Sequence, residues 1–259
     1  MNEMTLPPIA FKLLGHDLRW RLAALLANTD LRVQELVERL DQPQNLVSYH
    51  LHKLLAAGVV REQRSIADAR AIYYSLDLDR LQEILAGTGA ALHPGLHPGL
   101  WAGQAPRDLP ALAYPPRRVL FICTHNSARS QMAEGLLRAR SHGQVEVFSA
   151  GTQPAGVHPM AVQALAQMGV DISAQRSKSL DLFVGESFDD VITVCDRARE
   201  LCPVFPGDPA VIHWSIPDPL DVGGSDAERL QAFRRIAAQL GTRINYFLLA
   251  LYHAPEKSI

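Results

Sequence analysis

The segment that decides the fold of the second half of the chain is Arg118-Val119-Leu120-Phe121-Ile122-Cys123-Thr124-His125-Asn126-Ser127-Ala128-Arg129-Ser130. Its apolar run, residues 119–122, is typical of a buried strand, and the residues after 130 have the spacing of a helix. A strand, a short loop and a helix N-terminus form an anion site, because loop N–H groups and the helix dipole converge on one point. The sequence therefore predicts that an oxyanion binds to the loop residues Thr124, His125, Asn126, Ser127, Ala128 and Ser130.

The two reactive side chains of this loop are Cys123 and Arg129. The planar arginine fork suits two oxygens of a tetrahedral oxyanion. The positive field of the loop is expected to hold Cys123 as a thiolate, the nucleophilic form, and Ser130 can donate a hydrogen bond to the sulfur. A structural cysteine beside a surface arginine is the alternative, which the complete strand–loop–helix pattern disfavours.

Length and composition are those of an ordinary globular protein. The chain has 259 residues, enough for one large or two small domains, and its formal net charge is −2. That charge argues against a globally basic nucleic-acid binder but leaves room for a local basic patch. No apolar run approaches the roughly 20 residues needed to span a membrane, and the N-terminus lacks a secretory pattern, so we expect a cytoplasmic protein. Three cysteines in such a chain suit catalysis, redox chemistry or metal binding better than a disulfide scaffold.

From residue 117 onward, strand patterns alternate with helix patterns. This alternation predicts an α/β domain over 117–259, with a parallel sheet and helices on both of its faces. Ligands of such sheets bind beyond the carboxyl ends of the strands, where Cys123 lies. The expected strands are 119–122, 145–149, 189–194 and 211–215, and the expected helices are 129–140, 158–168 and 227–251.

The first half of the chain predicts a mostly α-helical domain over residues 1–88, with a loose arm at 1–10. Two helices joined by a tight turn and followed by a hairpin form a winged helix-turn-helix. Glycine and proline in residues 89–116 predict a linker between the two domains. The expected helices are 13–27, 31–40, 44–57 and 79–85, and the expected strands are 59–64 and 71–76.

The third of these helices presents an outward face that suits DNA. Its hydrogen-bonding side chains have the length to reach base edges and phosphates, and arginines on the hairpin could meet the DNA backbone. A solvated face of an interaction domain is the alternative. The candidate DNA-binding residues are Gln44, Asn45, Ser48, Tyr49, His52 and Lys53 on the helix and Arg61, Arg64 and Arg70 on the hairpin.

The pattern Ser48-Tyr49-His50-Leu51-x-x-Leu54-x-x-Ala57-Gly58-Val59-Val60 resembles the recognition helix and wing of the ArsR-type winged-helix repressors. The resemblance covers roughly residues 8–86 and implies a homodimer, formed through terminal helices, that binds palindromic operator DNA. Arsenite-sensing members often have paired cysteines before the recognition helix, but residues 31–38 contain none. Because soft-metal ligation needs thiolate, we expect no metal site in this domain. We also expect His50 to pack against the core.

Two further cysteines help to decide what chemistry the loop performs. Cys195 follows the apolar run 191–194, and Cys202 lies seven residues later. Together with the loop, several motifs resemble those of the thioredoxin-coupled arsenate reductases, within the low-molecular-weight protein tyrosine phosphatase superfamily. These motifs are Ser149-Ala150-Gly151-Thr152, Cys195-Asp196, Cys202-Pro203 and His213-Trp214-x-x-Pro217-Asp218-Pro219, so the resemblance covers roughly residues 117–253.

This resemblance implies that three thiols reduce arsenate without a bound cofactor. Cys123 attacks arsenic, and Asp218 supplies the proton for the oxygen that leaves. Cys195 then attacks Cys123 and releases arsenite, Cys202 attacks Cys195, and thioredoxin reduces the final disulfide. The alternative acids are Asp196, Asp208, Asp221 and Asp226.

The spacing of Cys195 and Cys202 sets a geometric requirement. Seven residues of intact helix rise by about 10.5 Å, whereas a disulfide needs Cα atoms within roughly 7 Å of each other. Residues 196–201 are therefore expected to bend or unwind when the two thiols are oxidised.

A cation site of the family is not expected here. Asn126, Glu134 and Ser149 match positions that organise the loop around potassium in some of these reductases. Where such members have an acidic ligand, this chain has Lys178, whose ammonium would repel a cation and could replace it. The sequence therefore predicts no potassium site.

Two other functions stay open. A phosphatase acting on phosphotyrosine or another monoester needs only Cys123, Arg129 and Asp218. Tyrosine phosphatases usually have a cysteine just before the loop arginine, where this chain has Ala128, and they do not need a further cysteine pair. The second alternative is a regulator whose C-terminal domain senses an oxyanion or redox state without turnover. The operator, the inducer, the thiol donor and any communication between the domains are not fixed by the sequence.

Overall fold

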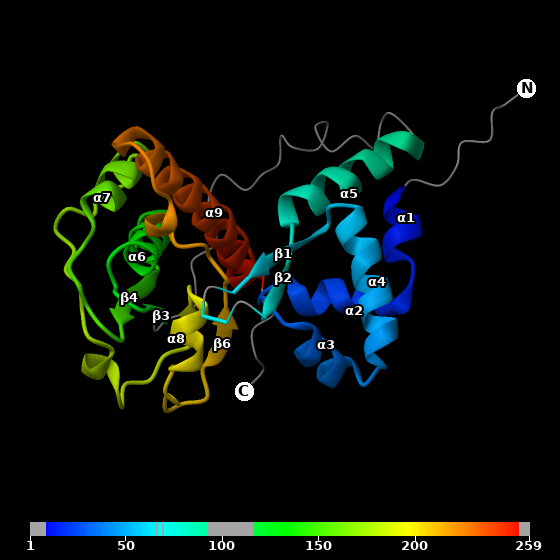
Figure 1. Ribbon diagram of the computed structural model, residues 1–259, viewed down its shortest axis with the longest axis horizontal. Coiled ribbons are helices and arrows are strands. Elements are labelled where there is room, and N and C mark those ends of the chain that lie inside the picture. The colour runs from blue at the N-terminus through cyan, green and yellow to red at the C-terminus, as the bar shows by residue number, and fades with distance from the viewer. Residues whose placement is uncertain (1–8, 66, 69, 93–115, 254–259) are drawn as a thin grey trace, which may run out of the picture. The chain divides into compact units, whose positions relative to one another are not determined.

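The computed structural model describes residues 9–65, 67–68, 70–92 and 116–253. The chain divides into two compact units, Met1–Leu109 and Pro110–Ile259 (Figure 1). Buried apolar side chains form a separate cluster in each unit. Within the described ranges, no helix is long and apolar enough to cross a membrane.

The first unit has the predicted winged helix-turn-helix. A tight turn at Asp41, whose φ is +51°, joins α3 (Val33–Leu40) to α4 (Gln44–Ala56). The wing is an antiparallel hairpin of β1 (Val60–Arg64) and β2 (Ile72–Leu76). The other helices are α1 (Ile9–Leu14), α2 (Asp17–Leu26) and α5 (Leu78–Leu92).

The single helix predicted over 13–27 is wrong, because the structure has two helices there. The Gly15 N–H donates to the Phe11 carbonyl at the end of α1, and a Cβ at Gly15 would lie 2.5 Å from that carbonyl oxygen. His16 then starts α2, since its Nδ1 accepts a hydrogen bond from the Leu18 N–H at 3.2 Å. Part of the predicted loose arm is also helical, because α1 begins at Ile9.

Two other helix limits differ from the prediction. Leu31, expected to begin a helix, instead exchanges backbone hydrogen bonds with Tyr74 of the wing. The closing helix was predicted to end at 85, but α5 packs against α1 and continues to Leu92. Most of the predicted linker, residues 93–115 with Trp101 and all but the first leucine of the two Leu-His-Pro-Gly repeats, lies outside the described residues.

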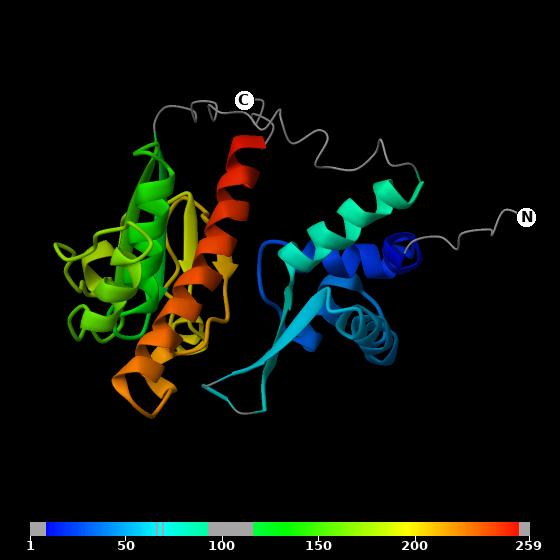
Figure 2. The same ribbon diagram turned by 90° about the horizontal axis from the view of Figure 1, so that it is seen from above.

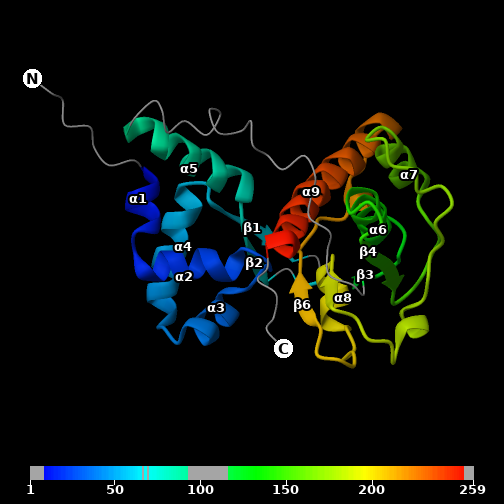
Figure 3. The same cartoon turned by 180° about the vertical axis from the view of Figure 1, so that it is seen from behind.

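The second unit contains the predicted parallel sheet. β3 (Arg117–Cys123) lies between β4 (Val145–Gly151) and β5 (Asp190–Thr193), and β6 (Ala210–His213) pairs with β5 (Figure 3). All three pairings are parallel, so Cys123 lies at the carboxyl edge as expected.

The helices of this unit pack on the sheet and on one another. α6 (Arg129–Arg140), which has the predicted limits, packs against β3 and β4 and against α7 (Pro159–Ala166) and α9 (Asp226–His253) (Figure 2). The short α8 (Asp196–Glu200) packs against β3 and β5. Two 3₁₀ helices, η4 (Leu180–Phe183) and η5 (Pro219–Asp221), were not among the expected elements.

Candidate active site

The loop between β3 and α6 turns its carbonyl groups outward. Three of them accept backbone hydrogen bonds from a neighbouring segment: Thr124 from Gln153 at 2.8 Å, His125 from Ala155 at 3.1 Å and Ser127 from His158 at 2.9 Å. Because the C=O and N–H of a trans peptide point in opposite directions, these bonds direct the following N–H groups inward. The backbone alone thus forms a concave donor set of the kind that binds an oxyanion.

Gly151, at the end of β4, makes this arrangement possible. A Cβ at this position would lie 2.7 Å from the Asn126 nitrogen and 2.7 Å from the Thr124 oxygen. Atoms that are not hydrogen-bonded do not approach so closely, so only glycine lets the loop pack on β4.

The Cys123 thiol lies at the base of the loop and is 3% exposed. The Asn126 N–H donates to its sulfur at 3.1 Å, and the Ser130 hydroxyl lies 2.9 Å from it. Asn126 has a positive φ of 44°, a conformation that asparagine tolerates better than most residues. The predicted contact between Ser130 and Cys123 is confirmed.

Asn126 connects the loop to the elements behind it. Its Nδ2 donates to Ser130 Oγ at 2.9 Å and to Ser149 Oγ at 2.8 Å. Its Oδ1 accepts from the Lys178 N–H at 2.7 Å and from Gln131 Nε2 at 2.8 Å. Since Asn126 is fully buried, these bonds fix the loop before any ligand arrives.

Lys178 brings a positive charge to the rear of the loop. Its Nζ lies 3.1 Å from Glu134 Oε2 and 3.2 Å from the Arg176 carbonyl oxygen. Ser149 donates to the same Glu134 carboxylate, which is 3% exposed. The Lys178 ammonium therefore lies beside Glu134, one of the three residues that match potassium-site positions in related reductases.

Arg129 and Asp218 form an ion pair at the mouth of the loop. Arg129 Nη1 also donates to the Ile216 carbonyl at 3.0 Å, and the Asp218 Oδ1 accepts from the Leu220 N–H at 3.1 Å. The guanidinium is therefore held from the segment that carries the carboxylate. Of the alternative acids, Asp208, Asp221 and Asp226 are exposed, and Asp196 is buried in another set of hydrogen bonds.

Cys195 lies beside the loop at the N-cap of α8. The Thr124 hydroxyl lies 3.4 Å from Cys195 Sγ, and the thiol is 4% exposed. Burial raises the pKa of Cys195, the Arg129 guanidinium opposes this, and negative charge on Cys123 raises it further. The Thr124 contact places this second thiol beside the loop that carries the first.

Cys202 follows α8 and is half-buried against the core of the unit. Burial raises its pKa to about 11, so the thiol is protonated at neutral pH. All three cysteines are reduced in this structure. Of the predicted catalytic residues, Cys123, Arg129, Asp218 and Cys195 lie at the loop, and Cys202 lies at the far end of α8.

The sequence analysis missed two polar groups that support this site. Gln131, fully buried on α6, holds Asn126 and the Arg176 carbonyl. Beside Cys195, Asp196 bonds to His213 and Ser215 of the next strand end. The His213-Trp214 motif marked the position of the second group, but the sequence assigned no role to these residues.

The predicted DNA-binding side chains share the solvent face of α4. Gln44, Asn45, Tyr49, His52 and Lys53 are exposed and Ser48 is half-buried, while His50 packs inward as predicted and is 5% exposed. Lys53 Nζ lies 5.2 Å from the centroid of the Tyr49 ring, and His52 Nδ1 donates to the Ser48 carbonyl at 2.7 Å. These contacts join Lys53 to Tyr49 and His52 to the backbone of its own helix.

The three wing arginines are all exposed. Arg61 on β1 forms an ion pair with Asp77, which also caps the start of α5. Arg64 ends β1, and Arg70 follows the tip, where Ile66 and Ala69 lie outside the described residues. Among the residues that are described, no group of three or more histidine, cysteine or acidic side chains could hold a metal ion.

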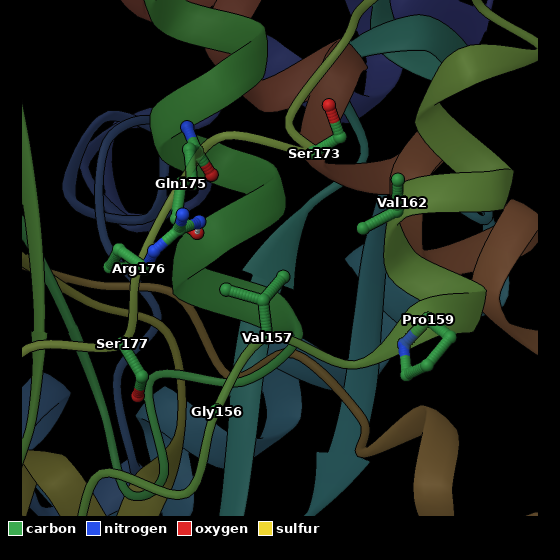
Figure 4. Close-up of a pocket in the computed structure, with 8 residues that line it drawn as sticks. All are labelled: Gly156, Val157, Pro159, Val162, Ser173, Gln175, Arg176 and Ser177. Carbon is green, nitrogen blue, oxygen red and sulfur yellow. Dashed lines mark hydrogen bonds between the residues drawn. The ribbon is translucent and has the colours of Figure 1, made fainter.

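A pocket of about 470 Å³ lies outside the loop (Figure 4). Its walls come from the start of α7, with Val157, Pro159 and Val162, and from the segment of Gln175, Arg176 and Ser177. Ser177 donates to the His125 carbonyl at 3.1 Å, so the pocket adjoins the loop's outer side. None of the predicted catalytic residues lines it, and the reactive thiols lie elsewhere.

Comparisons with known proteins agree with this site. The low molecular weight phosphotyrosine protein phosphatase family matches residues 118–256, and the MarR family matches residues 17–71. An arsenate reductase of Halalkalibacterium halodurans is 40% identical over 129 residues, which are 50% of this chain and 93% of that protein. A glutaredoxin arsenate reductase of Synechocystis is 33% identical over 128 residues, 49% of this chain and 93% of its own length.

A solved structure, described as an arsenate reductase in the phosphate binding state, aligns with 52% of this chain and 98% of its own. Its sequence identity is 30% and its TM-score 0.43. The family match covers more than half of the chain, including the loop, both further cysteines and Asp218. A segment that matches the MarR family precedes it, and through residues 118–256 the chain belongs to the low molecular weight phosphotyrosine protein phosphatase family.

Proposed function

We propose that this protein reduces arsenate to arsenite through Cys123, Cys195 and Cys202, and that its first unit binds DNA as an ArsR-type regulator. The relatives named arsenate reductase, which align over almost their whole length, support the first half of this proposal. The observation that carries it is the Thr124–Cys195 contact of 3.4 Å, because it brings a second buried thiol to the loop of the first. A phosphatase has no use for that thiol.

The chemistry needs four steps. Cys123 thiolate attacks arsenic held by the loop and Arg129, and Asp218 protonates the oxygen that leaves as water. Cys195 thiolate then attacks the Cys123 sulfur, so a disulfide forms, the sulfur–arsenic bond breaks, and its electron pair reduces As(V) to arsenite. Cys202 thiolate next attacks Cys195 and frees Cys123. Finally an external dithiol reduces the Cys195–Cys202 disulfide and is itself oxidised to a disulfide.

The relay is tested by arsenate-dependent oxidation of NADPH with thioredoxin and thioredoxin reductase. We expect turnover by the intact protein and its loss in Cys202→Ser. That variant should still release one arsenite per chain, because Cys123 and Cys195 can form their disulfide once. Absence of arsenite from the intact protein, with hydrolysis of para-nitrophenyl phosphate, would replace this proposal with phosphatase activity.

The thiol donor is the least constrained partner. We favour thioredoxin because buried Cys195 and half-buried Cys202 would provide an intramolecular disulfide for a dithiol to reduce. One relative is named a glutaredoxin arsenate reductase, so the same assay is run with glutaredoxin and glutathione. A higher rate with glutaredoxin would contradict the thioredoxin assignment. Both donors maintain reduced thiols in the cytoplasm, which is the compartment we propose.

Phosphatase activity is the second candidate function. Cys123, Arg129 and Asp218 form a nucleophile, a clamp and an acid, and the Arg129–Asp218 ion pair brings the last two together. Hydrolysis of a phosphate monoester that persists in a Cys195→Ser variant would establish this activity, because the relay thiols take no part in it.

DNA binding by the first unit is supported by the winged-helix fold and the exposed polar face of α4. We propose a homodimer that uses α1 and α5, which pack together and expose Ile9, Phe11 and Leu85 by 58%, 56% and 50%. Such a dimer would place two α4 helices on a palindromic operator. A monomeric protein at micromolar concentration in sedimentation equilibrium would contradict it.

The operator is found by selection from random DNA, and Lys53→Ala then tests the surface. We expect Lys53→Ala to weaken binding and to reduce the dependence of log affinity on log salt by about 1. Arg234→Ala, which removes the same charge from the exposed surface of α9, is the matched control and should leave both unchanged. If the protein is a regulator that senses arsenate without reducing it, the Cys195→Ser variant should still change transcription in cells when arsenate is added.

A further inference from the structure

A buried polar cluster surrounds the backbone of Cys195. It consists of Thr193, Asp196, His213 and Ser215, whose exposed fractions are 1%, 6%, 3% and 4%. Asp196 Oδ1 accepts from Ser215 Oγ at 2.7 Å and lies 3.1 Å from His213 Nε2. The other ring nitrogen, His213 Nδ1, lies 2.8 Å from Thr193 Oγ1. Carboxylate, imidazole and hydroxyls are thus joined in one set of contacts.

The cluster fixes the chain on both sides of Cys195. Thr193 precedes the cysteine by two residues, and Asp196 follows it directly. Both are held by the segment 213–215 of the adjacent strand end, to which a backbone bond from Trp214 N–H to the Thr193 carbonyl, 2.9 Å, also contributes. With its flanks held, the Cys195 side chain stays in contact with Thr124 of the loop.

The same segment reaches the other reactive groups. Beyond Ser215, the Ile216 carbonyl accepts from Arg129 and Asp218 pairs with it. One short stretch therefore holds the second thiol at its start and the oxyanion clamp at its end. Their relative positions are set by six consecutive residues, 213–218.

The opposite end of α8 is held much less firmly. Ala198 is fully buried, but Leu201 is 58% exposed and Val204 is 98% exposed. Cys202 lies between these last two residues. The bend that the Cys195–Cys202 disulfide requires is therefore easiest to make after Ala198.

We propose that Asp196, through Ser215 and His213, is a positioning residue that keeps Cys195 in place during the relay, so that Cys202 moves to Cys195. This inference rests on the proposed relay for its purpose. Its physical content, that Asp196 restrains the Cys195 thiol, is independent of arsenate. The two are tested separately.

The restraint is measured by alkylation of the reduced full-length protein with iodoacetamide, followed by mass spectrometry at each cysteine. We expect Asp196→Ala to raise the rate at Cys195 by about tenfold or more, because the local opening that exposes it becomes easier. Asp196→Asn keeps the Oδ1 acceptor and should stay close to the parent protein. Asp226→Ala, which removes an exposed carboxylate at the start of α9, is the matched control. An unchanged rate at Cys195 in Asp196→Ala would overturn the proposal.

The role in the relay is measured in a Cys202→Ser background, where the Cys123–Cys195 disulfide accumulates after one addition of arsenate. Asp196→Ala should slow disulfide formation by about tenfold, while the affinity of the loop for inorganic phosphate, measured by calorimetry, stays within about twofold. Asp196→Asn should restore the rate. Equal loss of phosphate affinity and of disulfide formation would mean general damage and would overturn a positioning role.

Ser215→Ala guards against misfolding of Asp196→Ala, since it removes one hydrogen bond and no charge. Like Asp196→Ala, it should raise the alkylation rate of Cys195 and lower the rate of disulfide formation. No change in either rate would contradict the proposal. If the Cys202→Ser parent forms no disulfide with arsenate, the relay itself fails. The alkylation rates then still decide whether Asp196 restrains Cys195.

Discussion

The Cys202 thiol is half-buried, yet the proposed relay requires it to act as a nucleophile. Burial raises its pKa to about 11, so most of the thiol stays protonated at neutral pH and the thiolate fraction rises as pH approaches that value. We expect alkylation of Cys202 in the reduced protein to accelerate about tenfold per pH unit between about pH 7 and pH 10. Quantitative mass spectrometry of the labelled peptide measures this rate. A plateau below pH 9 would contradict the raised pKa.

Gly151 offers a test of the loop that changes no reactive group. In Gly151→Ala the new Cβ would collide with Asn126 and Thr124, so the loop must move. We expect a loss of about 1–3 kcal/mol in the free energy of unfolding, as in other overpacked sites, together with at least about tenfold weaker phosphate binding. Denaturant melts and calorimetry measure the two effects.

Gly223→Ala is the control for this change. It introduces the same methyl group on an exposed turn, where no atom lies within 4 Å of the added Cβ. Phosphate affinity should match that of the parent protein. Equal affinities in Gly151→Ala and the parent would show that the loop does not depend on its approach to β4.

At the residue scale, the residues themselves joined only groups that lie in one continuous motif, whereas groups that meet by folding were placed by resemblance or missed. Cys123 and Arg129 share a loop, so their proximity follows from local structure. Asp218 was placed by resemblance, and its pairing with Arg129 bridges 89 positions. Asp196 at the start of α8 and Ser215 just beyond β6 are 19 positions apart, and only the pairing of β5 with β6 brings them together.

At the scale of elements, strongly periodic segments were predicted well. The helix 129–140 has its predicted limits because its apolar face is continuous and a loop fixes its start. The helix 13–27 was wrong because leucine spacing continues across Gly15, while the backbone turns there and His16 caps a new helix. Periodicity reports which residues face the core, and it does not report where the hydrogen-bond ladder is interrupted.

The short α8 is the element expected to change on oxidation. We expect a Cys195–Cys202 disulfide to require a bend after α8 begins, because seven residues of continuous helix rise too far for it, and the end near Cys202 is exposed whereas the start is held. Backbone amides of residues 199–202 should therefore lose protection from hydrogen exchange when the protein is oxidised. Amides of β5, which pair with the centre of the sheet, should keep theirs.

Hydrogen exchange with mass spectrometry on the reduced and oxidised protein provides this measurement. The oxidised Cys195→Ser variant, which cannot form the disulfide, is the control for other effects of oxidant. Identical protection of residues 199–202 in both redox states of the parent would rule out the rearrangement.

At the scale of the whole molecule, the two separate cores predict two independent responses to damage. Leu51 in the first core and Leu136 in the second are 1% and 0% exposed, so replacement of either by alanine should cost about 2–5 kcal/mol. We expect Leu51→Ala to lower one thermal transition and Leu136→Ala to lower the other. Scanning calorimetry resolves the two, and a single transition shifted equally by both variants would contradict independent cores.

The presence of both units in one chain has a consequence for their numbers. Separate regulators and enzymes can be made in different amounts, and a cell can adjust the ratio between them. Here every copy of the winged helix brings one set of thiols with it, so the ratio is fixed at one to one. A cell that makes more of the winged-helix unit therefore makes more of the cysteine-containing unit in the same proportion. Changes in expression alone cannot alter the ratio of the two units.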